Sequence, residues 1–248
     1  MMRVGVLDRS RLSRVTVRLD EQPNSRGEAR RTDVIVADPA DRAAPQAFLI
    51  EQSPESIASA HFHDGNQFQV VVAGGGLLGK HPVRPYTVHY ASRHTGYGPL
   101  VAGTEGLSYL TLRARPGCPP IWLPGQKHLM QPGPRCNIES PPSDADGTAD
   151  RLARKAVSVE TLLTPRDEGI AAWMLRIPPG ERAMPPLHPK SGGQYRVVAG
   201  GSMQAEGRVV GHLACIFVPG PESDTAITSG PEGLDVLVLQ FPEEPVPA

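Results

Sequence analysis

Two histidines and a glutamine form the most chemically suggestive group in the chain. The stretch reads His61-Phe-His63-Asp-Gly-Asn-Gln67. Residues at positions i and i+2 of an extended segment point to the same face, so both imidazoles converge on the lumen if the segment belongs to a small barrel. Imidazole nitrogens and a side-chain oxygen bind divalent metals. The pattern therefore predicts a metal site formed by His61 and His63, with Gln67 as a third ligand.

The same stretch resembles the first motif of the cupin superfamily, G-x5-H-x-H-x3,4-E-x6-G. His61 and His63 fall on the two histidines of that motif, Gln67 falls on its glutamate, and Gly74 falls on its closing glycine, whereas Glu55 occupies the position of the opening glycine. The resemblance implies an all-β fold of antiparallel jelly-roll barrels that bury a ligand in the lumen. It also implies a divalent metal ion as cofactor, with iron, manganese, nickel and zinc as the candidates.

The second cupin motif, which supplies one more histidine, is altered here. Family spacing places Tyr97 at that histidine position. Three alternatives remain for the first copy. His94 reaches the metal if its loop is shifted, His89 faces inward from the preceding strand, or Tyr97 binds weakly or acts as an acid, base or hydrogen-bond donor. We take Tyr97 and His94 as the candidate catalytic residues; the simplest alternative is that Tyr97 only packs against its neighbours.

Two segments recur along the chain in the same order. VVAGG occurs at residues 71–75 and 197–201, an offset of 126, and G-x-E-G-L-x-x-L-x-L occurs at 103–112 and 230–239, an offset of 127. A period of this length is too long for a solenoid and indicates two copies of one domain, as in a tandem two-barrel cupin. Motif spacing assigns the second copy a degenerate set of residues: Gly180, Pro186, His188, Gly193, Gly200 and Asp224. The chemistry is therefore expected in the first copy.

Short apolar runs separated by Gly and Pro predict strands in both copies. The runs are 46–50, 67–72, 87–90, 107–112, 171–177, 194–198, 213–218 and 234–241. Residues 151–163 fit either a short helix or a leading strand. Eight prolines between residues 116 and 142 argue against a regular strand ladder there, although Ile121-Trp-Leu123 is apolar enough to pack on a barrel.

These patterns divide the chain into a first barrel with an N-terminal arm (1–115), a Pro-rich linker (116–150) and a second, degenerate barrel (151–248). Arg113 and Arg176 lie on expected strands. Either could anchor a substrate carboxylate in a lumen, but an outward orientation is the expectation that we favour for both. Gly74-Gly-Gly76 is expected to form a turn between strands, because no helix follows it.

Composition narrows the class of protein. The net charge is −1, which favours neither nucleic acid nor an anionic membrane as partner. Three cysteines without a C-x-x-C pattern suit a reducing compartment, and the sequence has neither a signal peptide nor an apolar stretch long enough to span a membrane. We expect a cytoplasmic protein with a small-molecule substrate, and duplicated barrels of this kind are compatible with a homodimer.

Three functions follow from these features. The first is a metal-dependent oxidoreductase resembling the ring-cleaving dioxygenases among two-barrel cupins. The second is a lyase, isomerase or hydrolase of the same fold, with Tyr97 or a histidine as acid or base and a metal as Lewis acid. The third is a small-molecule-binding protein without catalysis.

Overall fold

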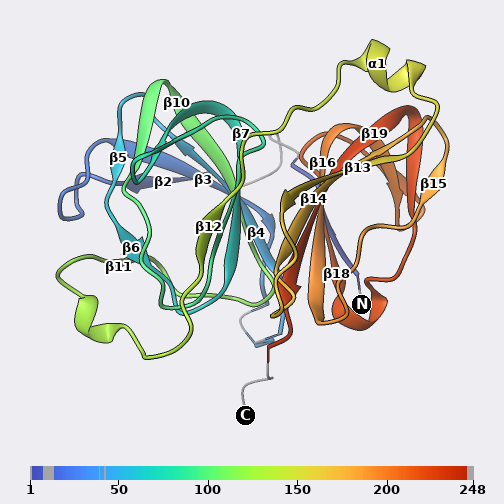
Figure 1. Cartoon of the computed structure of the whole chain (residues 1–248). Helices are drawn as coiled ribbons and strands as arrows, with labels where there is room; N and C mark the ends of the chain where they lie inside the picture. The colour runs from blue at the N-terminus through green and yellow to red at the C-terminus, as the bar shows by residue number, and fades with distance from the viewer. Residues whose placement is uncertain (1, 8–13, 39, 42, 245–248) are drawn as a thin grey trace. The chain divides into compact units, whose positions relative to one another are not determined.

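The computed structural model describes residues 2–7, 14–38, 40–41 and 43–244. Antiparallel β-strands dominate, as expected for an all-β chain, and the described residues fall into two compact units (Figure 1). The first barrel comprises residues 14–142, and the second barrel combines residues 2–7 with residues 143–244. No helix among the described residues has the length and apolarity that crossing a membrane requires.

The first barrel has a nine-stranded sheet whose main path runs β12-β9-β7-β10-β4-β3-β2, with β5 beside β10 and β8 beside β7, and a separate β6–β11 pair. Its elements are β2 (Arg14–Arg18), β3 (Glu28–Ile35), β4 (Gln46–Gln52), β5 (Ile57–Ala58), β6 (His61–Phe62), β7 (Gln67–Leu78), β8 (His81–Val83), β9 (Val88–Ala91), β10 (Leu100–Arg113), β11 (Ile121–Trp122), the 3-10 helix η1 (Lys127–Leu129) and β12 (Asn137–Glu139).

The second barrel has an eight-stranded sheet with the main path β1-β18-β16-β19-β14-β13, to which β15 and β17 add. Its elements are β1 (Arg3–Gly5), the helix α1 (Thr148–Ala153), β13 (Ser158–Leu163), β14 (Ala171–Ile177), β15 (Arg182–Ala183), β16 (Ser191–Ala205), β17 (Arg208–Val210), β18 (Cys215–Pro219), the 3-10 helix η2 (Gly220–Glu222) and β19 (Ile227–Pro242). Residues 151–163 thus contain both of the expected alternatives, the end of a short helix and a strand.

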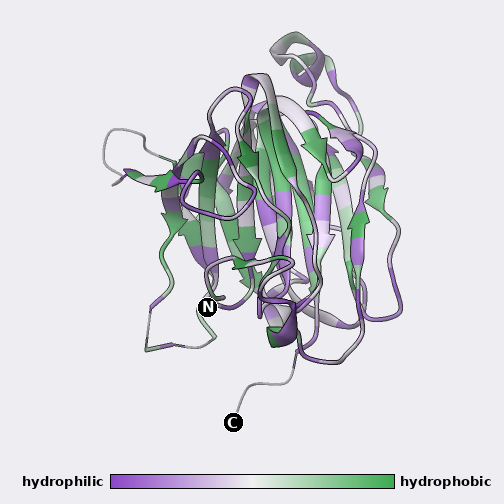
Figure 2. Cartoon of the chain, turned by 90° about the vertical axis from the view of Figure 1, so that its left-hand side faces the viewer, coloured by the Kyte–Doolittle hydropathy of each residue, from purple (hydrophilic) through white to green (hydrophobic). Residues whose placement is uncertain are grey.

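Every apolar run that predicted a strand lies in or overlaps one, and successive apolar and polar bands mark the strands in Figure 2. The structure differs from the expected domain limits at two places. Strand β1 pairs with β18, so residues 3–5 complete the second barrel rather than an arm of the first. The Pro-rich segment also supplies two short strands to the first barrel, because β11 pairs with β6 and β12 pairs with β9.

The repeated glycines were expected in a turn, and that expectation is wrong. Gly74 lies inside β7 with a φ of +66°, and a Cβ there would come within 2.2 Å of the carbonyl oxygen of Gly106 on β10. Gly201 has the same role in the second barrel, with a φ of +72° and a Cβ position 2.0 Å from the carbonyl oxygen of Gly233. Only glycine fits such a close crossing. The two copies are therefore related by 127 residues along these strands, which shifts the expected counterpart of Gly74 from Gly200 to Gly201.

Candidate functional site

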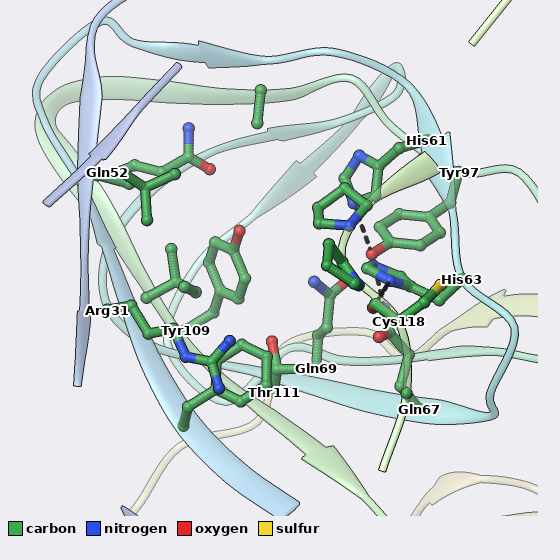
Figure 3. A pocket seen from close by; sticks show the side chains of 18 of the residues that line it. Arg31, Gln52, His61, His63, Gln67, Gln69, Tyr97, Tyr109, Thr111 and Cys118 are labelled. Carbon is green, nitrogen blue, oxygen red and sulfur yellow. Dashed lines mark hydrogen bonds between the residues drawn. The ribbon is translucent and has the colours of Figure 1, made fainter. Parts of the chain in front are cut away.

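The first barrel encloses a cavity of about 350 Å³ in its lumen (Figure 3). Strands β4, β7 and β10 supply much of the wall, and the segment after β10 closes one side through Gly117, Cys118 and the two prolines that follow. The wall is mainly apolar, with Val17, Leu19 and Phe48 among its members. A cluster of polar side chains lies on one side of it, at His61, His63 and Tyr97.

Backbone pairing brings His61 and Tyr97 together. The N–H of His61 donates to the carbonyl of Tyr97 at 3.1 Å, and the N–H of Tyr97 donates to the carbonyl of His61 at 3.0 Å. Directly opposed residues of an antiparallel bridge place their side chains on the same face. The phenol oxygen of Tyr97 accordingly lies 2.8 Å from Nε2 of His61. The structure thus places Tyr97 in the lumen beside the first histidine, as its position in the second motif predicts.

A directional chain of hydrogen bonds passes through Tyr97. Nδ1 of His61 lies 2.7 Å from the carbonyl oxygen of Ser59, which can only accept, so Nδ1 carries the imidazole proton. Nε2 therefore has a lone pair and accepts the phenol proton of Tyr97. The phenol oxygen in turn accepts a hydrogen bond of 2.6 Å from Nε2 of Gln67. The order of donation is Gln67 to Tyr97 to His61 to Ser59.

Burial keeps both members of this pair neutral at physiological pH. It lowers the pKa of His61 from the usual 6.5 to about 4, an effect that the Ser59 hydrogen bond only partly opposes. Burial also raises the pKa of the Tyr97 phenol well above its usual range. The proton that the two side chains share thus resides on Tyr97, and His61 is the acceptor.

Arg113 points into the lumen, contrary to the outward orientation that we expected. Its side chain is 3% exposed, and Nε and Nη2 donate to Oε1 of Gln67 at 3.2 and 3.0 Å. Burial lowers the pKa of Arg113, yet a guanidinium remains protonated in proteins. The contacts fix the amide of Gln67, with its oxygen toward Arg113 and its nitrogen toward Tyr97.

Arg113 also determines the protonation of His63. Nδ1 of His63 lies 3.0 Å from Nη2 of Arg113 and 3.0 Å from the carbonyl oxygen of Cys118. The two contacts make opposite demands on Nδ1: a guanidinium nitrogen can only donate and needs a lone pair there, whereas a carbonyl oxygen can only accept and needs a proton there. We assign the lone pair to Nδ1 and the imidazole proton to Nε2, because the carbonyl has another donor in Arg113. The Cys118 carbonyl accepts Nη1 of Arg113 at 3.3 Å. Burial and then the charge of Arg113 lower the pKa of His63 well below its usual value.

These assignments decide whether the expected ligands fit a divalent metal. The Nε2 lone pair of His61 accepts the Tyr97 proton, Nε2 of His63 carries a proton, and Oε1 of Gln67 accepts two bonds from a cation. The described residues contain no group of three His, Cys, Asp or Glu side chains placed to hold a metal ion. His61, His63 and Gln67 do share the cavity, but this donor set does not fit a divalent metal ion in the arrangement seen here.

The two other histidines considered for the site do not line this cavity. The ring of His94 packs against Phe62 with centroids 5.7 Å apart, and Phe62 points away from the lumen because it alternates with His61 and His63. His94 is therefore not placed to act with Tyr97. His89 approaches Tyr97 with its ring, at 5.0 Å between centroids, but its nitrogens contact Gln69 and Asn137 at 2.9 and 2.7 Å.

One contributor to the site was given the wrong orientation from the sequence, and another was missed. Arg113 ends a strand whose last five residues are all buried, so the sequence pattern did not show that its side chain lies in the lumen. Cys118 was assigned to a linker, yet its backbone contacts both Arg113 and His63, and its N–H donates to Asp64 at 2.8 Å. The apolar Ile121-Trp122 pair was the available signal, because it anchors this segment against His61 and Phe62.

The second barrel replaces the polar cluster with a neutral pair. Gln194 and Gln240 are fully buried opposite each other on β16 and β19, and Nε2 of Gln194 donates to Oε1 of Gln240 at 3.2 Å. With the 127-residue relation they correspond to Gln67 and Arg113, so Gln194 rather than Gly193 stands at the ligand position. His188 is half-buried and Asp224 is exposed. The second copy is degenerate, as predicted, and Gln240 replaces the buried arginine of the first copy at this position.

Comparison with known proteins identifies the fold. No family model and no curated protein sequence matches the chain. Among solved structures, a candidate dioxygenase from Nostoc punctiforme superposes with a TM-score of 0.62 at 12% identity, covering 98% of this chain and 83% of that one. A deletion mutant of Bacillus subtilis oxalate decarboxylase OxdC gives 0.55 at 12% identity, covering 92% and 77%. The bacterial pirin YhhW of Escherichia coli, in complex with nickel(II), gives 0.54 at 12% identity, covering 98% and 100%.

These neighbours are cupin-fold proteins, and the chain has the tandem jelly-roll fold that the His61–Gly74 stretch predicts. At identities near 12% the likeness establishes the fold alone. What the protein does must be argued from its own residues.

Proposed function

We propose that the first barrel binds a small organic anion in its lumen and transfers a proton on it, which is the chemistry of an isomerase or a lyase. The observation that carries the proposal is the directional chain from Gln67 through Tyr97 to His61. A chain of this kind can accept a proton at one point and pass it on. No step of the proposal uses a metal ion.

Charge indicates the class of ligand. Of the described residues that line the cavity, Arg31 and Arg113 are cations, and none is an aspartate or a glutamate. Arg31 pairs with Asp33 outside the wall and lies over the ring of Phe48, with 4.0 Å from its guanidinium carbon to the ring centroid. The charge of Arg113 therefore acts on a lumen of low polarity, where electrostatic interactions are strong. An anionic oxygen group is the ligand that such a lumen favours.

The polar cluster can move one proton without other groups. A C–H or O–H of the bound molecule gives its proton to the phenol oxygen of Tyr97, while the phenol proton moves to Nε2 of His61. The bound molecule gains the negative charge, which Nε2–H of His63 and the nearby guanidinium stabilise on a carbonyl oxygen. Returning the proton to another atom completes an isomerisation, and loss of a leaving group completes an elimination.

Deuterium exchange tests the proposal with simple probes. We expect 2-oxobutyrate or 2-oxo-4-phenylbutyrate, incubated with the protein in D₂O, to exchange C3 hydrogens faster than in buffer, as followed by proton NMR. Tyr97→Phe should slow that exchange by about 10²- to 10⁴-fold, the usual contribution of a positioned acid or base. His128→Asn, at an exposed histidine of the same unit, is the matched control. Exchange that survives in Tyr97→Phe would sink the proposal.

A metal-dependent oxidoreductase of the dioxygenase type is the second proposal. It is favoured by one observation, that His61 and His63 line the same cavity as an H-x-H pair should. It requires Arg113 to leave His63 and Gln67. Elemental analysis of the wild-type protein beside the His61→Ala/His63→Ala double variant separates the two. Equal, substoichiometric metal in both supports the first proposal, and stoichiometric metal lost in the double variant would replace it with the second.

A further inference from the structure

A buried oxygen at the other side of the cavity is unused by the proton-transfer chain. Gln52 ends β4, is 4% exposed and points into the cavity across from His61 and Tyr97 (Figure 3). Its amide nitrogen lies 3.2 Å from Oγ of Ser56 and donates to the carbonyl oxygen of Leu100 at 3.5 Å. Its Oε1 has no hydrogen-bond partner among the described residues. Buried polar atoms are nearly always paired, so this acceptor needs an explanation.

The backbone leaves the side chain of Gln52 little freedom to turn away. Gln52 pairs with Leu107 on β10 and with Ala29 on β3, so it lies in the interior of the sheet. The Leu100 carbonyl can only accept, so its contact with the amide group, 3.5 Å long, orients the nitrogen toward Leu100 and the oxygen away from it. Leu19, Ala29 and Ala58 line the wall nearby and bring no donor side chain to the oxygen.

We propose that Gln52 is a specificity-determining residue whose Oε1 accepts a hydrogen bond from a hydroxyl group of the ligand. This inference rests on the proposed function, in which the anionic group of the same ligand lies at the His63 side. The ligand is thus a hydroxylated organic anion, with its two polar groups separated by an apolar part that contacts the wall.

The donor is a neutral hydroxyl rather than an ammonium. Two arginines and no carboxylate line the cavity among the residues that the structure describes, so a further positive charge would be buried without a counter-ion from the wall. A hydroxyl also brings acceptor lone pairs, and the phenol of Tyr109 lines the cavity on the same side as Gln52. Sites that pair a buried polar group with a substrate hydroxyl reject analogues that lack it, because the protein group is then left unpaired.

Matched pairs of carboxylates test the inference. The probes are 4-hydroxybenzoate, 4-hydroxyphenylacetate and 3-(4-hydroxyphenyl)propanoate, each beside the compound without the phenol group. Their Kd values are measured by isothermal titration calorimetry or ligand-observed NMR. At least one hydroxylated member should bind the wild-type protein about tenfold more tightly than its partner, the size expected for one satisfied buried acceptor.

Substitution assigns the preference to Gln52. In Gln52→Met, which keeps the length of the side chain and removes the oxygen, the preference should fall below about twofold. Thr111→Val, which removes a hydroxyl from the same cavity without changing its shape, should leave the preference intact. A preference that survives in Gln52→Met would overturn the inference.

The wild-type comparison stands by itself if Gln52→Met does not fold. Binding of both members of every pair with equal Kd would overturn the role of Gln52 while leaving anion binding in place. Binding of neither series would overturn the proposed function, and the inference with it.

Discussion

Nη2 of Arg113 lies 3.0 Å from Nδ1 of His63, and the tautomer that we assign to His63 from this contact is opposite to that of His61 in the same H-x-H stretch. His61 carries its proton on Nδ1, against the carbonyl of Ser59, whereas His63 carries its proton on Nε2. For Nε2 of both imidazoles to bind one metal ion, both Nε2 atoms would have to be unprotonated. The arginine converts one of the pair from a ligand into a hydrogen-bond donor.

The tautomers can be observed directly. In a long-range ¹H–¹⁵N correlation spectrum at pH 7, we expect His61 to show the Nδ1–H form and His63 the Nε2–H form. Tyr97→Phe should leave the tautomer of His61 unchanged, because Ser59 still accepts from Nδ1. It should shift the Nε2 resonance of His61, which loses its phenol donor. Finding His63 with its proton on Nδ1 would contradict the assigned role of Arg113.

The free energy of unfolding should decrease as the pH is lowered through the range in which these histidines titrate. Burial lowers the pKa of His61 and of His89 from 6.5 to about 4, and it lowers that of His63 in the same direction. Between about pH 6.5 and pH 4 the unfolded chain therefore binds more protons than the folded chain, so lowering the pH favours unfolding. Stability is fully present above about pH 6.5 and is lost toward pH 4. A shift from 6.5 to about 4 corresponds to about 3 kcal/mol each for His61 and His89.

Each barrel has one tryptophan, which allows the two to be followed separately. In Trp173→Phe the fluorescence of Trp122 reports the first barrel. Urea unfolding of this variant should show that the free energy of unfolding of the first barrel decreases between pH 6.5 and pH 4. In Trp122→Phe the remaining Trp173 reports the second barrel, whose His188 and His212 are not fully buried. A fall of the same size in that control would disagree with the assignment to His61, His63 and His89.

The fold was predictable because it depends on features that recur locally. Apolar runs of strand length, the repeated glycines and the H-x-H stretch predicted two antiparallel barrels, and Tyr97 was placed in the lumen by its position in the second motif. The counterpart of Gln67 was harder to place. The VVAGG segments match at an offset of 126 residues, whereas β7 and β16 are equivalent at an offset of 127 and share one irregularity, between Val71 and Ala73 and between Val198 and Gly200. The counterpart of Gln67 is therefore Gln194 rather than Gly193, in agreement with the offset of the G-x-E-G-L segments.

The orientation of Arg113 could not be predicted for a different reason. Leu110-Thr-Leu-Arg113 alternates apolar and polar residues, which favours an outward polar face, yet both faces of this part of β10 are buried and Thr111 and Arg113 line the lumen. The tautomer of His63 and the amide of Gln67 depend in turn on Arg113, which is 50 residues from the one and 46 from the other. The sequence shows the residue types of the expected ligands, but it does not show that Arg113 donates hydrogen bonds to His63 and Gln67.

The glycine crossing gives a prediction about stability. Gly74→Ala should destabilise the first barrel by at least about 3 kcal/mol, because the added methyl meets the Gly106 carbonyl and the backbone is held at positive φ. Chemical denaturation monitored by Trp122 fluorescence measures the change. Gly125→Ala is the control, because a Cβ there meets no atom within 4 Å. Equal stability of the two variants would show that β7 and β10 can separate at little cost.

Removal of Arg113 should create the metal site that the H-x-H stretch predicts. In Arg113→Met the lone pair on Nε2 of His63 becomes available through a change of tautomer, with Nδ1–H donating to the Cys118 carbonyl 3.0 Å away. Oε1 of Gln67 loses both donors, and the lumen loses a positive charge. We expect Co²⁺ to bind this variant at least about tenfold more tightly than the wild-type protein, a size typical of changes around metal ligands. Visible absorption of the bound Co²⁺ measures this affinity.

Arg31→Met is the matched control. It removes the other cation of the wall, which pairs with Asp33 and not with the ligands, so its affinity for Co²⁺ should not rise. The gain should also vanish in Arg113→Met/His63→Ala. Wild-type affinity for Co²⁺ in a folded Arg113→Met protein would mean that something other than the guanidinium keeps His61, His63 and Gln67 from acting together.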